Sequence, residues 1–153
     1  MSGLYPFSPN YLEVSGRSAD MGASEIAGHR MHYVDEGRGD PVVMVHGNPS
    51  WSFFYRELIE ELKSSHRVIA PDHIGCGRSD KPPDEHYDYT LSTRIADLGA
   101  LVDSLDLHDI TLVVHDWGGM IGMSWAAQNP DRIAKLVVMN TAAFPLPTDK
   151  AFP

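Results

Sequence analysis

The sequence predicts an α/β fold in which helices cover both faces of a mostly parallel β-sheet. Short runs rich in Val, Ile, Leu and Met occupy positions 42–45, 110–114 and 134–139, and they have the length of buried strands. Between them lie segments whose apolar residues recur at helical spacing. Strands that are apolar throughout and alternate with helices are typical of a parallel sheet covered on both sides.

The elements follow one another in a regular order along the chain. We expect strands at 11–14, 29–36, 42–45, 66–70, 110–114 and 134–139, and helices at 52–64, 90–105 and 117–129. Residues 72–88 are predicted to form a loop, because glycines and prolines interrupt regular structure there. The loops that follow parallel strands lie along one edge of a sheet. The loops at Gly47, Asp72 and Asp116 are therefore expected to converge on one crevice.

Composition narrows the class of protein. The chain has 153 residues, one domain's worth at most, with a net charge of −9 and a single cysteine, Cys76. The acidic balance provides no basic face for nucleic acid, and no apolar stretch approaches the length of a membrane-spanning helix. One cysteine and an N-terminus without the features of a signal peptide predict a cytoplasmic protein. The histidines lack metal-ligand spacing, so neither a metal nor a cofactor is expected.

The stretch ITLVVHDWGGMIG, residues 110–122, indicates a catalytic site. Its strand breaks sharply into a helix, and such a turn presents one side chain, that of Asp116, beside the unpaired N–H groups of the helix. A nucleophile elbow usually holds Ser here, in the pattern G-x-S-x-G, whereas this chain has Asp in that position and Val114 in place of the first glycine. Gly118 and Gly119 favour a nucleophilic Asp116 over the alternative, a carboxylate that only caps the helix.

A second motif, HGNP, ends another strand at the same edge and consists of His46, Gly47, Asn48 and Pro49. Asn48 is expected to offer its backbone and side-chain N–H groups to the crevice, and the backbone amide of Trp117 would be the second donor of an oxyanion hole. Because the indole N–H of Trp117 can only donate, Asn48 and Trp117 could also hold a leaving anion. The alternatives are a plain tight turn at HGNP and a core aromatic at Trp117.

A carboxylate nucleophile suits particular reactions. If Ser attacked a saturated carbon it would form an ether, which water does not readily release. Asp forms an ester with the same carbon, and a water activated by histidine hydrolyses that ester at its carbonyl. An aspartate in the elbow therefore favours carbon–halogen bonds, epoxides or strained rings as substrates over ordinary esters.

Three motifs in this order, HGNPSW, PDHIGCGRSDKP and HDWGG, resemble those of haloalkane dehalogenases and their relatives in the α/β-hydrolase superfamily. The resemblance extends from about Tyr5 to the C-terminus. It implies the N-terminal half of an α/β-hydrolase fold, with Asp116 as the catalytic nucleophile. Asn48 paired with Trp117 is similar to the halide-binding pair of dehalogenases and differs from the usual motif of epoxide hydrolases.

Within that branch, GMIGMSWA and NTAAFPLP look most like the β-lactone decarboxylases of bacterial long-chain olefin biosynthesis. Those enzymes convert a cis-β-lactone with two long alkyl arms into a cis-alkene and carbon dioxide. The resemblance implies a small hydrophobic substrate, attack by Asp116 on the strained ring, and membership of a multi-enzyme assembly. Two alternatives stay open: a haloalkane dehalogenase, and a non-catalytic fragment that docks with partner enzymes.

The chain departs from that family in ways that affect activity. In members of the family a helical cap follows the strand that ends near Met139, and the remaining strands, the acid and the catalytic histidine follow the cap. None of the eight histidines here matches the catalytic one. We therefore expect residues 1–153 to be part of a single core domain that lacks the cap and C-terminal strands and is inactive alone. Strand 134–139 would be an exposed apolar edge, and 17–27 resembles an insertion away from the site.

Three further residues near the motifs are expected to be structural. Asp72 is predicted to hold its loop through hydrogen bonds to the turn. Cys76 lies between loop glycines and is interpreted as a small, unreactive side chain. The side chain of His115 should point to the opposite side of its strand from Asp116, because successive side chains of a strand alternate.

Overall fold

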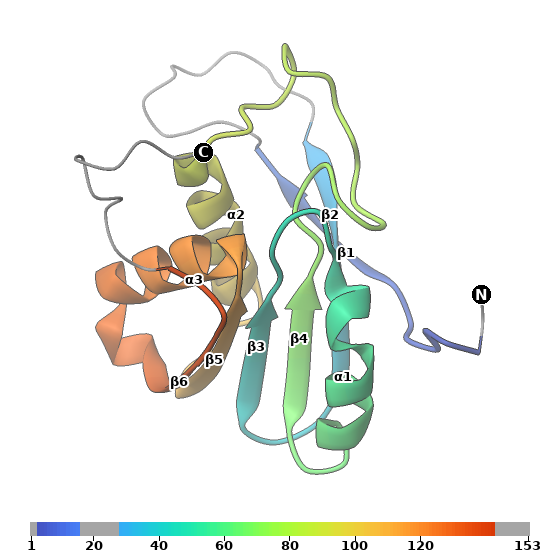
Figure 1. Cartoon of the computed structure of the whole chain (residues 1–153), viewed down its shortest axis with the longest axis vertical. Coiled ribbons are helices and arrows are strands. Elements are labelled where there is room, and N and C mark those ends of the chain that lie inside the picture. The colour runs from blue at the N-terminus through green and yellow to red at the C-terminus, as the bar shows by residue number, and fades with distance from the viewer. Residues whose placement is uncertain (1–2, 16–27, 143–153) are drawn as a thin grey trace.

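The computed structural model describes residues 3–15 and 28–142 (Figure 1). Its strands are β1 (Asn10–Val14), β2 (His29–Gly37), β3 (Pro41–Val45), β4 (Arg67–Pro71), β5 (Ile110–His115) and β6 (Ile133–Met139). Its helices are η1 (Ser52–Tyr55), α1 (Arg56–Leu62), α2 (Leu91–Ser104), α3 (Trp117–Gln128) and η2 (Pro130–Arg132). The insertion expected at 17–27 and most of NTAAFPLP lie outside the described residues.

The strands form one six-stranded sheet in the order β1-β2-β4-β3-β5-β6. The pairs β1–β2 and β2–β4 are antiparallel, whereas β4, β3, β5 and β6 run parallel to one another. The mostly parallel sheet expected from the sequence is confirmed. In the register of β3 and β5, Val45 lies opposite Val114, so the chain segments that follow these two strands start side by side.

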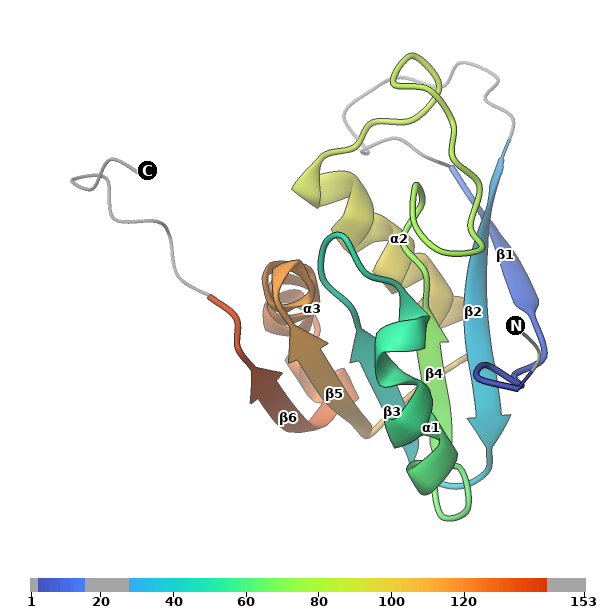
Figure 2. The same cartoon turned by 45° about the vertical axis from the view of Figure 1, so that its right-hand side comes forward.

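Helices cover both faces of the central strands, as Figures 1 and 2 show. Val43 and Val45 of β3 belong to a core cluster with buried residues of α2 and α3. Val42 and Met44, the alternate residues of β3, belong to a second cluster with Ile59 of α1. Because successive side chains of a strand point to opposite faces, one apolar strand supplies both cores. The three-layer arrangement predicted from the sequence is therefore present.

The first helical segment differs from the single helix expected over 52–64. It consists of the 3-10 turn η1 followed by α1, which ends at Leu62. The backbone N–H of Ser52 donates to a carboxylate oxygen of Asp72 (2.8 Å), and the hydroxyl of Tyr55 donates to the carbonyl of Val45 (2.9 Å). These tertiary hydrogen bonds anchor the first turn in a tighter geometry than an α-helix has.

β6 is the last strand of the sheet among the described residues, and it pairs with β5 along one side. Its Leu136, Val137 and Val138 are exposed. The exposed apolar edge expected from the sequence is thus observed in the described part of the chain. Within residues 3–15 and 28–142, no helix combines the length and apolar character needed to cross a bilayer.

Candidate active site

Asp116 occupies the turn between β5 and α3 with backbone angles of φ 53° and ψ −131°. A positive φ is uncommon for a residue other than glycine, and such strained positions persist where the surrounding structure enforces them. Close packing of the two neighbouring loops holds Asp116 in this conformation. A Cβ at Gly118 would overlap the carbonyl oxygen of Val45, and a Cβ at Gly47 would overlap the side chain of Asp116. The glycines of both motifs therefore let the two loops approach each other.

The carboxylate of Asp116 is held by one of its oxygens. The backbone N–H of Asn48 donates to Oδ1 at 2.8 Å. The backbone amides of Trp117 and Asn48 both stabilise the charged form and lower the pKa of Asp116 below its usual value. No hydrogen bond from a described residue reaches Oδ2. The side chain is therefore an anion with one oxygen fixed and the other open.

The expected oxyanion hole consists of the backbone amides of Asn48 and Trp117. In the structure both amides interact with the carboxylate of Asp116 itself. If Oδ2 forms an ester with a substrate carbon, Oδ1 becomes the carbonyl oxygen of that ester and already accepts a hydrogen bond from the backbone N–H of Asn48. Charge that develops on Oδ1 during hydrolysis would be stabilised without reorganisation.

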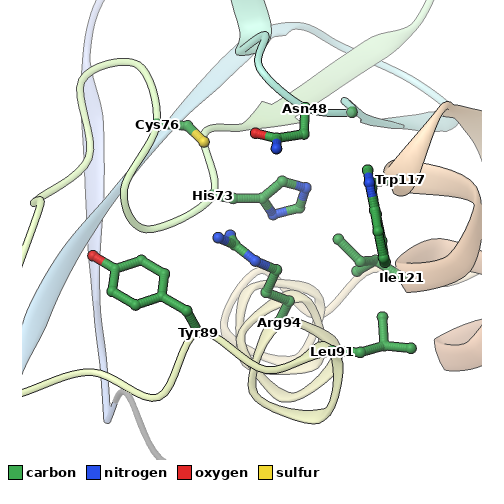
Figure 3. Close-up of a pocket in the computed structure, with 9 residues that line it drawn as sticks. Asn48, His73, Cys76, Tyr89, Leu91, Arg94, Trp117 and Ile121 are labelled. Carbon is green, nitrogen blue, oxygen red and sulfur yellow. The ribbon is translucent and has the colours of Figure 1, made fainter. Parts of the chain in front are cut away.

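A cavity of about 330 Å³ opens beside the elbow (Figure 3). Asn48 and Trp117 form one part of its wall, and Leu91 and Ile121 contribute apolar surface. Trp117 is 51% exposed, which excludes the core aromatic considered as an alternative. A second hollow lies against Asp116, Trp117 and Met120, so Trp117 borders both spaces.

His46 of the HGNP motif joins two of the converging loops. Its Nδ1 bonds to the carbonyl of Gly47 (2.7 Å), while its Nε2 accepts from the backbone N–H of His73 (3.0 Å). His73 in turn bonds through Nε2 to the carbonyl of His46 (3.1 Å). Burial lowers the pKa of both imidazoles, that of His73 well below its usual value. Both rings are therefore neutral braces that hold the loops together.

Asp72 lies at the centre of a buried hydrogen-bond network rather than at the cavity. Its carboxylate accepts from the backbone N–H groups of Ser52 and Arg78 (2.8 Å each) and from Nδ1 of His32 (2.9 Å). Burial alone would raise its pKa, but these hydrogen bonds outweigh burial and lower the pKa of Asp72. The structure places Asp72 in the loop-holding role expected from the sequence. The sequence did not reveal its partner His32.

His115 lies directly before Asp116 but faces another part of the molecule. Its ring stacks on Phe54 of η1, with centroids 4.4 Å apart and an interplanar angle of 14°. None of the eight histidines, all of which lie in the described ranges, hydrogen-bonds to the Asp116 carboxylate. Within these ranges no imidazole that could act as a general base is in hydrogen-bonding contact with the carboxylate at the elbow.

The cavity also contains polar residues that the sequence analysis missed. His73, Tyr89 and Arg94 line it together with Cys76. Burial raises the pKa of the Cys76 thiol, which keeps it protonated and poorly nucleophilic. Arg94 occupies an ordinary polar position of an amphipathic helix, so no local pattern could have singled it out.

A family model and several known proteins match this chain. A family model described as "alpha/beta hydrolase fold" matches residues 40–153. The chain is 64% identical over 151 residues to a cis-3-alkyl-4-alkyloxetan-2-one decarboxylase of Shewanella oneidensis, covering 98% of this chain and 44% of that protein. It is 46% identical over 140 residues to a haloalkane dehalogenase of Psychrobacter cryohalolentis, covering 90% of this chain and 44% of that protein.

Among solved structures, the tetrameric haloalkane dehalogenase DpaA from Paraglaciecola agarilytica superposes with a TM-score of 0.77 at 40% identity. That match covers 91% of this chain and 45% of the dehalogenase. The chain thus spans about half the length of the curated relatives it matches. The matched half is the one that contains the elbow.

Proposed function

Because the chain belongs to the α/β-hydrolase fold family, we propose that it carries the nucleophilic half of an enzyme that opens a β-lactone ring with the carboxylate of Asp116. One observation carries the proposal. The carboxylate is fixed at Oδ1 by the backbone N–H of Asn48 (2.8 Å), and Oδ2 accepts no hydrogen bond from a described residue. An ionised, oriented and half-open carboxylate is what attack on a saturated carbon requires.

The chemistry begins with ring opening. Oδ2 of Asp116 forms a bond to C4 of a cis-3,4-dialkyl oxetan-2-one, and the ring bond from C4 to oxygen breaks, leaving its electron pair on a carboxylate. The C3–carboxylate bond then breaks, and its electron pair forms the C3=C4 double bond. The Asp116–C4 bond breaks at the same time and returns its electron pair to Oδ2. The products are an alkene, carbon dioxide and the free carboxylate of Asp116.

The stereochemistry supports this order of events. Attack on C4 from the face opposite the ring oxygen places the Asp116 oxygen and the carboxylate on opposite sides of the C3–C4 bond. Elimination from that geometry, with no rotation about C3–C4, gives a cis-alkene from a cis-lactone. The name of the Shewanella relative specifies a cis-3-alkyl-4-alkyl ring, which supports such a substrate.

Asn48 and Trp117 are proposed to hold the negative charge that appears on the leaving oxygen. Both line the cavity beside the elbow, and the exposed indole of Trp117 has a single N–H that only donates. His46, Gly47, Pro49, Gly118 and Gly119 are proposed to support the two turns. A cytoplasmic location and assembly with partner enzymes belong to the same proposal and rest on the resemblance to olefin-forming decarboxylases.

The second candidate is hydrolytic dehalogenation. It is favoured by the 46% identity to the Psychrobacter dehalogenase and by the fold of DpaA. The same attack by Asp116 would expel a halide, but release of the product would then need a water molecule and a general base. No described histidine hydrogen-bonds to the carboxylate of Asp116, so that base would have to come from elsewhere.

Product analysis distinguishes the two candidates. Residues 1–153 would replace the matching part of the Shewanella oneidensis relative, and the chimera would be incubated with a cis-3,4-dialkyl oxetan-2-one and separately with 1-bromobutane. The proposal predicts many turnovers of alkene and carbon dioxide from the lactone, and at most a single turnover of bromide release from the bromoalkane. Continued bromide release without alkene would support the dehalogenase instead. The same chimera with Asp116→Asn must form neither product, and the unaltered relative is the positive control.

A further inference from the structure

Arg94 of α2 projects its guanidinium into the cavity beside the elbow, toward His73 and Cys76 (Figure 3). One of its nitrogens, Nη1, donates to the carbonyl of Ile74 at 3.2 Å. Among the described residues, no carboxylate lies within ion-pair distance of Arg94. The cavity wall therefore contains a cation without a matching anion.

The groups around Arg94 do not neutralise it. His73 is neutral, and the Tyr89 ring lies 5.7 Å below the guanidinium carbon as a cation–π partner. Asp97, three residues further along α2, accepts a hydrogen bond from the hydroxyl of Tyr87 and forms no ion pair with Arg94. Burial raises the pKa of Asp97 to about 6, although the charge of Arg94 lowers it. Arg94 also lowers the pKa of the Cys76 thiol, although burial raises it more. The charge of Arg94 therefore acts on the part of the cavity wall that contains Cys76.

We propose that Arg94 is the anchor of a carboxylate subsite, which lies in this cavity next to Asn48 and Trp117. The inference rests on the proposed function and extends it to the leaving group. When the lactone ring opens, one oxygen of the new carboxylate is the former ring oxygen, which Asn48 and Trp117 would hold. The second oxygen has no counterpart in a halide, and the guanidinium supplies the charged donor that it needs.

The proposed subsite distinguishes the two reactions considered for this elbow, opening of a β-lactone and dehalogenation. A halide is a single atom and requires only the side-chain N–H groups of Asn48 and Trp117. A carboxylate is planar and has two acceptor atoms, and the forked donors of arginine match that shape. Arg94 therefore acts as a specificity-determining residue that favours substrates whose leaving group is a carboxylate.

Calorimetric titration of the 153-residue chain with sodium butyrate and with sodium bromide tests this subsite. Arg94→Gln is expected to weaken butyrate binding about tenfold or more, which corresponds to about 1.4 kcal/mol, and to change bromide binding less than about twofold. Arg94→Lys, which keeps the charge and loses the fork, should fall in between. Arg38→Gln alters an exposed arginine elsewhere and should leave both affinities unchanged.

The outcomes separate the subsite from the proposed function. Equal weakening of butyrate and bromide by Arg94→Gln would overturn the subsite, because it would show a general effect of charge or of misfolding. Failure of butyrate to bind the unaltered chain would also overturn it. Neither result bears on product formation from the lactone by the chimera, which tests Asp116 independently. Circular dichroism of each variant identifies any loss of fold.

Discussion

Two aspartates of this molecule directly follow parallel strands, and their surroundings give them different roles. Asp72 follows β4 and is fully buried, and its two oxygens accept from Ser52, Arg78 and His32. Asp116 follows β5, and one of its oxygens accepts from the amide of Asn48 while the other is open. Hydrogen bonds lower the pKa of both carboxyl groups. Under the proposed function, the oxygen of Asp116 that accepts no hydrogen bond from a described residue, and not the charge, is what distinguishes a reactive carboxylate from a structural one.

The largest expected effect is at the open carboxylate. Asp116→Asn keeps the shape and the acceptor at Oδ1 but removes the nucleophile. We expect the rate of ester formation with 1-bromobutane to fall about 1,000-fold or more, as losses of catalytic nucleophiles do. Thermal unfolding followed by circular dichroism should show little change in stability. If Asp116→Asn still formed the ester at an appreciable rate, Asp116 would not be the nucleophile, and it would not differ from Asp72 in reactivity.

At the closed carboxylate, substitution should affect stability. Asp72→Asn removes the charge from a buried, hydrogen-bonded pair with His32, which is expected to lower the free energy of unfolding by about 3 kcal/mol. Urea denaturation measures this change. Asp106→Asn is the matched control, because Asp106 is exposed and its positive φ suits asparagine. The control should change stability by less than about 0.5 kcal/mol.

A smaller effect is expected from the indole N–H of Trp117, a residue that lines the cavity beside the elbow. Trp117→Phe keeps an aromatic ring at the rim and removes the indole donor. Loss of one hydrogen-bond donor to the leaving bromide should slow ester formation with 1-bromobutane by about 10- to 100-fold. The ester should still form on Asp116. Quench-flow measurement of bromide release gives the rate. An unchanged rate would show that the indole does not contact the leaving group.

The smallest expected effect is a dependence on pH, which should differ between the free energy of unfolding and the rate of ester formation at Asp116. The folded-state pKa of His46 and of His73 lies below the usual 6.5, so the unfolded chain binds more protons at mildly acidic pH. Their contribution to stability is therefore lost as pH falls below about 6.5, by up to about 1.4 kcal/mol per pH unit for each histidine. His73→Leu should reduce the slope of the free energy of unfolding against pH.

Over that same range, the rate of ester formation by folded molecules should stay constant. Asp116 reacts as its anion, and its lowered pKa keeps it charged until the pH falls below the usual carboxyl value of 3.8. Quench-flow measurements of bromide release at pH 5 to 8, corrected for the folded fraction, compare the pH dependence of the reaction rate with that of stability. A rate that falls together with stability would contradict an Asp116 anion stabilised by its neighbouring amides.

Much of this organisation could be predicted from local sequence. The apolar runs at β3, β5 and β6 specified parallel strands, although only β3 and β5 are buried and β6 is largely exposed. The break from β5 into a glycine-containing turn located Asp116. The helix over 52–64 was only partly right, because hydrogen bonds from distant residues shape its first turn. The boundary between η1 and α1 therefore depends on tertiary contacts that no local pattern contains.

The polar partners of the site could not be predicted from local sequence. His32 meets Asp72 only because β2 pairs with β4, and the two residues are 40 positions apart in the chain. Arg94 reaches the cavity from α2, a helix whose sequence resembles any amphipathic helix. Such contacts depend on strand order and helix placement, which single-sequence patterns do not specify.

Tandem mass spectrometry of the 153-residue chain after incubation with 1-bromobutane identifies the side chain that attacks carbon. We expect one butyl group per chain, located on Asp116, with no butyl group on Asp72 or Cys76. The ester is also expected to persist, because no described histidine hydrogen-bonds to the carboxylate of Asp116 to activate water there. A butyl group on Cys76, or an unmodified Asp116 in a folded chain, would contradict the assignment of Asp116 as the nucleophile.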